Sequence, residues 1–228
     1  MEKRLVRVGR WFGALALLGL GLWMWLVISA PAERIQGVVQ KILYVHVPCV
    51  PPAYLGFILT AIGGLGYLRT RRAAWDRLAL AGAEVGIVFC TLIVVSGPIW
   101  AKAVWGHWWV WDLRLTMTLV LWFLYVAYLF IRALAFGSDT ARTFAAVYGI
   151  AGTAVIPFVH YAVRLAGGSA MHPSTPASGG TLPASMAYPL LAGLGTFLLV
   201  FLYLLTRRFE VAGLESRLLE AGGSSEDH

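Results

Sequence analysis

The sequence predicts an all-α, polytopic membrane protein with six transmembrane helices. Of its 228 residues, 59% are hydrophobic and only 13% are charged, and the mean hydropathy is +0.75. A soluble domain of this size needs far more polar surface. Each of six apolar segments is long enough to cross a hydrocarbon core about 30 Å thick, which takes about 20 helical residues. We expect helices because backbone polar groups in lipid must be satisfied within their own segment.

The six segments follow one another along the chain. The first is long, lacks a clear small-x-small cleavage site and precedes Pro31-Ala32-Glu33, so we expect an uncleaved span and not a signal peptide. The fourth is the shortest. We expect one domain over residues 1–221 and a disordered cytoplasmic tail over 222–228. The predicted spans are residues 11–30, 50–68, 78–99, 115–131, 144–163 and 185–205.

Lys and Arg residues are distributed unevenly between the two sides of these spans. Loops rich in Lys and Arg stay in the cytoplasm, so the distribution predicts that both termini are cytoplasmic. Residues 31–49, 105–112 and 164–184 then face the periplasm. The basic clusters flank apolar runs, so the net charge of +7 does not indicate nucleic-acid binding. Five of the 18 basic residues fall on the outer side: Arg34, Lys41, Lys102, Arg114 and Arg164.

Residues 105–112 contain four tryptophans, a histidine and a carboxylate. One or two tryptophans would anchor a membrane interface, but four in eight positions make an aromatic surface that could hold a large planar ligand. If the segment is helical, Trp105, Trp109 and Asp112 share one face, and Trp108 and Trp111 another. The alternative is a structural subunit whose tryptophans only anchor the membrane.

Four histidines fall on the outer half of the predicted protein. His46 lies just before the second span and His172 lies in the Gly-, Ser-, Thr- and Pro-rich loop before the sixth. Two neutral imidazoles from separate loops can clamp a metal porphyrin from both faces. His160 could line the same pocket or bond a backbone carbonyl, and His107 could contact the ligand. For any one of them alone, an interfacial hydrogen-bonded role is the simpler alternative.

Several charged side chains and one thiol are further candidates for functional residues. Asp112 could pair with Arg114 or cap the helix of the fourth span, and outer cations such as Arg114 could bind the carboxylates of a ligand. For Glu84, inside the third span, we favour helix packing or a subunit contact over a proton-linked step. Cys49 is expected to be a small apolar filler. No Cys-x-x-Cys is present, so thiol redox chemistry is poorly supported.

Residues 105–116, Trp-Gly-His-Trp-Trp-Val-Trp-Asp-Leu-Arg-Leu-Thr, resemble the signature of the CcmC family of cytochrome c maturation proteins, part of the tryptophan-rich WWD haem-handling group. The likeness extends to residues 41–48 and 157–161. It implies that haem, as haem b, is held between His46 and His172 as axial ligands. The rest of the implied site is the tryptophan segment with its two charged residues: Trp105, Trp108, Trp109, Trp111, Asp112 and Arg114.

The resemblance also implies partners: a CcmE-type haem chaperone that receives the haem, a CcmD-type small membrane protein and the CcmA–CcmB ABC transporter. No Gly-x-x-x-x-Gly-Lys-Ser/Thr occurs in the sequence, so energy would come from those partners. We therefore expect a haem-delivery protein of the bacterial inner membrane and not an enzyme in its own right. The alternative is a channel or exporter subunit that moves haem across the membrane.

Overall fold

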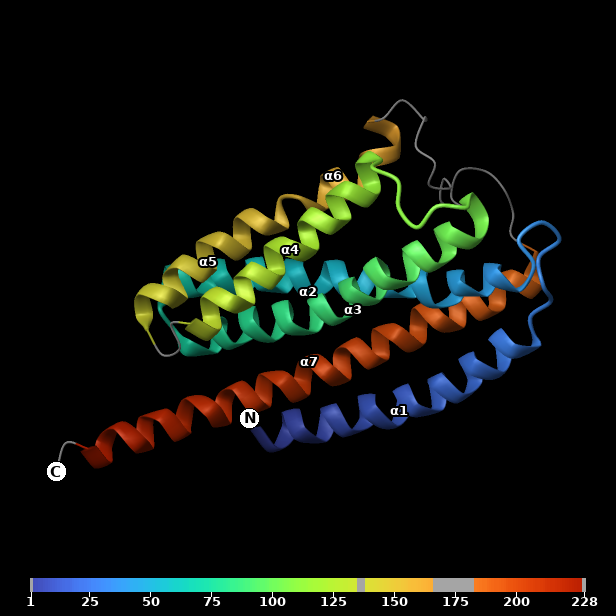
Figure 1. The fold of residues 1–228 in the computed structure, drawn as a ribbon. Helices are drawn as coiled ribbons and strands as arrows, with labels where there is room; N and C mark the ends of the chain where they lie inside the picture. Colours follow the sequence, from blue (N-terminus) through green and yellow to red (C-terminus); the bar gives the residue numbers. More distant parts are fainter. Residues whose placement is uncertain (1, 135–137, 166–182, 227–228) are drawn as a thin grey trace.

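The structure is a computed structural model that describes residues 2–134, 138–165 and 183–226. Six helical stretches in these ranges are long and apolar enough to cross a membrane, which confirms the predicted fold class. In order, the elements are α1 (Glu2–Ser29), the 3-10 helix η1 (Val38–Ile42), α2 (Leu43–Thr70), α3 (Ala73–Trp105), α4 (Leu113–Leu134), α5 (Asp139–Thr153), α6 (Ile156–Leu165) and α7 (Ala184–Glu226) (Figure 1).

The helices run lengthwise beside one another, with α2 and α3 at the centre (Figure 1). Helices α4, α5 and α6 lie on one side of this pair, and α7 lies on the other with α1 packed against it. The end of the bundle where α3 stops at Trp105 is called the tryptophan end below. The opposite end, which carries Arg72, Arg132 and Arg142, is called the arginine end.

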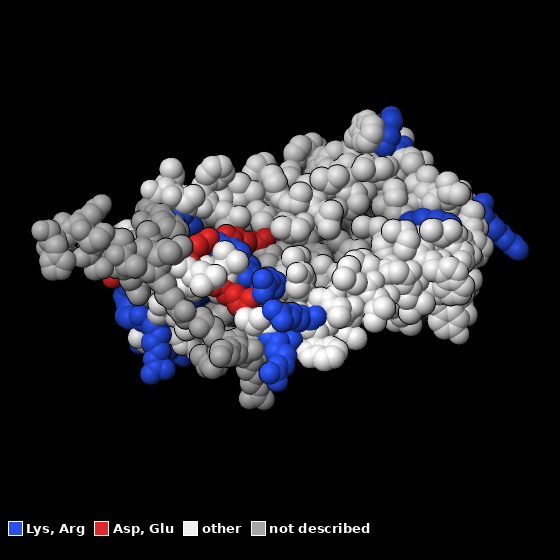
Figure 2. Space-filling model, turned by 90° about the horizontal axis from the view of Figure 1, so that it is seen from below, with Lys and Arg blue, Asp and Glu red and all other residues white. Residues whose placement is uncertain are grey.

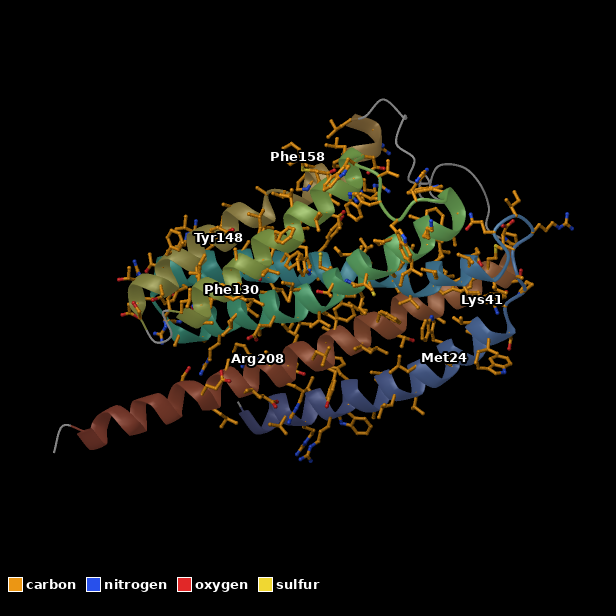
Figure 3. All side chains as sticks on the ribbon, viewed as in Figure 1. Met24, Lys41, Phe130, Tyr148, Phe158 and Arg208 are labelled. Carbon is orange, nitrogen blue, oxygen red and sulfur yellow. The ribbon has the colours of Figure 1, made fainter. Side chains whose placement is uncertain are left out.

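Charged residues gather toward the two ends. Figure 2 shows acidic and basic side chains together near the arginine end, a few basic ones at the tryptophan end and uncharged side chains between them. Figure 3 places Lys41 at the tryptophan end and Arg208 on α7. Arg208 Nη2 donates to Glu84 Oε1 over 3.0 Å. Glu84 thus joins α3 to α7, which agrees with the helix-packing role predicted for it.

Glycines let α2 and α3 approach closely. A Cβ atom on Gly56 would lie 2.6 Å from the Cα of Gly86, and one on Gly82 would lie 2.7 Å from the carbonyl oxygen of Gly56. Small residues of this kind are how membrane helices bring their backbones together without a hydrophobic driving force. The resulting contact fixes the position of His46 on α2 relative to the part of α3 that ends in the tryptophans.

Two of the predicted spans differ from the observed helices. Helix α2 begins at Leu43, so His46 lies in its first turns and not in a loop before it. Helix α2 continues through its prolines, which membrane helices tolerate. The fifth span is broken at Ala154 and Val155 into α5 and α6. Pro157 has no N–H to donate to the carbonyl of Thr153, so a regular helix cannot pass this point without losing that bond.

Candidate functional site

A cavity of about 410 Å³ lies at the tryptophan end between α2, α3, α4 and α6. This size is within the range of about 300–1,000 Å³ that small-molecule sites occupy. Its lining includes the aliphatic side chains of Val50, Ile93, Val94 and Leu121. It also includes a set of aromatic, polar and basic side chains: His46, Tyr54, Trp100, Trp105, Trp109, Arg114, Thr118, His160, Tyr161 and Arg164.

His46 is the cavity histidine contributed by α2. Its Nδ1 atom lies 2.8 Å from the Ser96 hydroxyl oxygen on α3. The ring also packs beside Gly97, where a Cβ atom would lie 3.4 Å from His46 Cε1. Helix α3 therefore orients a cavity-lining side chain that α2 carries.

The tryptophan segment is not a helix. Helix α3 ends at Trp105, and Gly106 adopts the left-handed conformation (φ 78°) that ends helices and favours glycine. The helical arrangement considered for residues 105–112 is therefore wrong, because a left-handed glycine follows its first residue. Trp105 and Trp109 line the cavity. The side chains of Trp108 and Trp111 are 60% and 76% exposed and do not line it.

Asp112 and Arg114 have different roles at the start of α4. Asp112 Oδ1 accepts a hydrogen bond from the backbone N–H of Leu115 over 2.7 Å, which confirms the predicted cap. Asp112 does not line the cavity. Arg114 does line it, and its Nη2 donates to the carbonyl oxygen of His160 over 3.4 Å. That bond holds the guanidinium group between α4 and α6.

The other histidines are placed differently. His160 lines the cavity and is exposed, and its ring lies edge-on to Tyr161 with centroids 4.9 Å apart. Its backbone carbonyl, and not its ring, accepts the hydrogen bond from Arg114. His107 is exposed and does not line the cavity. His172 lies outside the described residues.

Trp100 is a cavity residue that the sequence reasoning missed. Its indole Nε1 donates to Gln36 Oε1 over 3.0 Å, and its ring meets Trp105 edge to face with centroids 5.0 Å apart. The only signal for it was its position one residue after the predicted third span. Tyr54, which lines the cavity, and Ser96, which contacts His46, were missed too, because nothing in a continuous apolar run distinguishes such positions.

A tight turn in the loop between α1 and η1 holds Gln36 in place. Glu33 Oε2 accepts hydrogen bonds from the backbone N–H groups of Gln36 (2.7 Å) and Ile35 (2.9 Å). These bonds hold the pKa of the Glu33 carboxyl below its usual range. Gly37 closes the turn with a φ of 60°. The loop thereby supports Trp100, and through it the aromatic wall of the cavity.

The chemistry of the lining suits one class of ligand. Within the described ranges, no group of three or more His, Cys, Asp or Glu side chains could hold a bare metal ion. The cavity instead combines an imidazole, indole rings and guanidinium groups. Such a set can bind a flat apolar molecule that carries carboxylates and that brings a metal with an open axial position.

Comparison with known proteins gives the family. A family model described as "CcmC: Heme exporter protein C" matches residues 2–221. The "Putative cytochrome c biosynthesis ccmC-like mitochondrial protein" of Marchantia polymorpha is 32% identical over 154 residues, covering 68% of this chain and 63% of the relative. "Heme exporter protein C" of Escherichia coli K12 is 34% identical over 177 residues, covering 72% of this chain and 69% of the relative.

The protein of the same name from Bradyrhizobium diazoefficiens is 31% identical over 222 residues, covering 94% of this chain and 82% of the relative. The match thus extends over nearly the whole chain in one relative, whereas it spans less than two thirds of the length of the Marchantia protein. Together, the family match and these relatives show that the chain belongs to the CcmC family.

Proposed function

We propose that this chain binds haem in the cavity at the tryptophan end and delivers it to a CcmE-type haem chaperone. The observation that carries the proposal is the meeting of His46, Trp105, Trp109 and Arg114 on one cavity, although they come from different elements. Each side chain matches one part of haem b. Imidazole binds the iron, indole rings pack on the porphyrin, and guanidinium binds carboxylates such as the propionates.

His172 is proposed as the second axial ligand. It lies in the segment that leaves α6 after Leu165 and enters α7 at Ala184, and both helices have these ends at the tryptophan end. Axial ligands lie on opposite faces of a porphyrin, and two separate parts of the chain, such as α2 and this connection, can supply one each. His160 and His107 are the reserve candidates, and His160 is the better placed because it lines the cavity.

The membrane orientation is proposed from the Lys and Arg distribution. The positive-inside rule places the arginine end in the cytoplasm and the cavity at the periplasmic face of the inner membrane. The names of the relatives, "Heme exporter protein C" and a ccmC-like cytochrome c biosynthesis protein, fit a role in supplying haem for c-type cytochromes. A CcmD-type small protein and a CcmA–CcmB transporter are the proposed membrane partners.

The delivery step needs an accessible edge of the haem. The exposed rings of Trp108 and Trp111 lie in the same segment as the two cavity tryptophans. They are proposed to contact the chaperone, while Trp105 and Trp109 hold the porphyrin. The reacting chemistry would belong to the haem, and the protein would supply ligation, orientation and a docking surface.

The described core favours delivery at one face over a channel. Toward the arginine end the space between α2, α4 and α5 is filled by Phe57 and Tyr125, whose rings stack with centroids 3.7 Å apart, and by the fully buried Tyr128. The cavity does not reach these rings among its described lining residues. A haem pathway along the bundle would require this aromatic core to open.

The test is the binding of added hemin to the purified full-length chain, followed by the Soret and visible spectrum. We expect a six-coordinate spectrum that is weakened or altered in both His46→Ala and His172→Ala. His228→Ala, which changes the histidine of the predicted cytoplasmic tail, is the matched control and should bind like the unmodified chain. Failure of the unmodified chain to bind hemin would contradict the proposal and leave only membrane anchoring for the tryptophans.

A further inference from the structure

We propose that Ser96 is a positioning residue for haem ligation, which keeps the proton of His46 on Nδ1 and presents Nε2 to the iron. This inference rests on the proposed function, since it assumes that His46 is an axial ligand. It goes beyond that function by assigning a role to a residue of α3 that the tryptophan motif does not include.

The hydrogen bonds of Ser96 determine the direction of its contact with His46. Its hydroxyl oxygen lies 2.5 Å from the carbonyl oxygen of Leu92, one turn earlier in α3, and 2.8 Å from His46 Nδ1. A carbonyl oxygen can only accept, and a serine hydroxyl has one proton. The hydroxyl therefore donates to Leu92, and its oxygen accepts from the N–H at His46 Nδ1.

This arrangement selects one form of the imidazole. A neutral histidine has one protonated ring nitrogen and one with a lone pair. With the proton on Nδ1, the lone pair is on Nε2, which is the nitrogen that can bind iron. The back-bond to Leu92 also fixes the rotamer of Ser96, so the oxygen that His46 meets is held by the helix itself.

The ring has a second contact with the same turn of α3. An added Cβ atom at Gly97 would lie 3.4 Å from His46 Cε1, an ordinary van der Waals distance, so the edge of the imidazole lies directly beside this turn. Helix α3 therefore borders the ring at Nδ1 and at Cε1, and the Ser96 hydroxyl selects its tautomer. Gly97 and the following Pro98 line the cavity.

Partners of this kind strengthen a metal ligand. A hydrogen bond from the non-ligating N–H of a histidine raises the basicity of the ligating nitrogen, and loss of such a partner typically costs about 10–100-fold in metal affinity. When the ligating nitrogen becomes less basic, ferric iron loses more stabilisation than ferrous iron, because the ferric ion carries the higher charge. Removal of the Ser96 hydroxyl should therefore weaken haem binding and raise the midpoint potential of the bound haem.

The experiment compares Ser96→Ala and Ser96→Thr in the purified full-length chain, with hemin as the probe. Ser96→Ala should lower hemin affinity about 10–100-fold and raise the midpoint potential. Ser96→Thr keeps a hydroxyl at the same place and should restore both values. Ser216→Ala is the matched control, because Ser216 makes the same back-bond, to the Ala212 carbonyl on α7, away from the cavity.

A His46→Ala variant separates the failure of this inference from the failure of the proposed function. An unchanged spectrum in His46→Ala would overturn His46 as a ligand, and the role of Ser96 with it. If His46→Ala loses the six-coordinate spectrum but Ser96→Ala leaves the midpoint potential unchanged, only the role of Ser96 is overturned. A potential that rises in Ser96→Ala and is not restored in Ser96→Thr would also contradict it.

Discussion

The two ends of the bundle use their polar residues in opposite ways. At the arginine end, carboxylates of α3 meet arginines from other helices. Arg132 Nη2 donates to Asp76 Oδ2 over 2.8 Å while Nη1 donates to Oδ1, and Arg208 bonds Glu84. At the tryptophan end, basic and aromatic side chains surround a cavity. The polar residues of one end hold helices to each other, whereas those of the other end line a space that suits a ligand.

The position of the carboxylates explains this difference. The described acidic residues at the tryptophan end are both used by the backbone near them. Glu33 accepts N–H groups of its own turn, and Asp112 caps α4. Neither lines the cavity, whereas Arg114 and Arg164 do. The lining therefore carries a net positive charge, which favours a ligand that brings its own carboxylates.

The largest effect on stability is expected from loss of the Asp76–Arg132 pair. The two side chains are only 10% and 13% exposed, so Asp76→Ala leaves a buried guanidinium without its partner. Such a loss typically costs about 3–5 kcal/mol of unfolding free energy. Thermal unfolding of the purified chain should show it, while hemin binding at low temperature persists. Asp139→Ala is the control, because Asp139 is 82% exposed and its pair with Arg142 contributes about 0–1 kcal/mol.

The corresponding substitution at the tryptophan end, Arg114→Gln, should weaken hemin binding and leave the stability of the fold largely unchanged. Arg114→Gln keeps a polar side chain but removes the charge that is proposed to bind a haem propionate. Hydrogen bonds to charged groups contribute about 1.5–3 kcal/mol, so hemin affinity should fall about 10–100-fold with little change in the unfolding temperature. Arg34→Gln, which changes an outer cation away from the cavity wall, should bind hemin normally. Equal affinity in both variants would remove the proposed role of Arg114.

A substitution where α2 and α3 pack between the two ends should reduce both the stability of the chain and its affinity for hemin. In Gly56→Ala the new methyl group would lie 2.6 Å from Gly86 Cα, so α2 and α3 must separate. Overpacking of this kind costs about 1–3 kcal/mol. The separation should also weaken hemin binding, because His46 and Ser96 lie on the two helices. Gly195→Ala adds the same group where nothing lies within 4 Å and should leave stability and binding unchanged.

The smallest effect is expected where the outer loop supports the aromatic wall. Trp100→Phe removes the donor to Gln36 but keeps an aromatic ring beside Trp105. A double-mutant cycle of Trp100→Phe with Gln36→Leu should give a coupling of about 0.5–1.5 kcal/mol in unfolding free energy. If the changes in unfolding free energy of the two single variants add up to that of the double variant, the loop and the cavity wall are independent.

Much of the fold could be predicted from the sequence because span length and apolar composition are local properties. The cap formed by Asp112 was predictable for the same reason, since capping depends on residues three positions apart. The start of α2 at Leu43 was not predicted, because prolines are best tolerated in the first turn of a helix, and Pro51 and Pro52 therefore favour a start near Val50. The break before Pro157 was missed, because the apolar run there is long enough for one uninterrupted span.

The contacts that shape the site could not be predicted from a single sequence, because they join residues far apart in the chain. His46 and Ser96 are 50 residues apart, and Trp100 and Gln36 are 64 apart. Only the pairing of α2 with α3 and the turn at Glu33 bring these residues together. The tryptophan motif lies at the end of the bundle that holds the cavity, although only two of its four tryptophans line it. The role of His172 stays a prediction.

The central claim is that the tryptophan end ligates haem iron through His46 while the arginine end only holds the helices together. Electron paramagnetic resonance of the ferric, hemin-loaded full-length chain tests it most directly. We predict a low-spin signal from two axial histidines in the unmodified chain and in Asp76→Ala, and its conversion to a high-spin signal in His46→Ala. A low-spin signal that persists unchanged in His46→Ala would contradict the account.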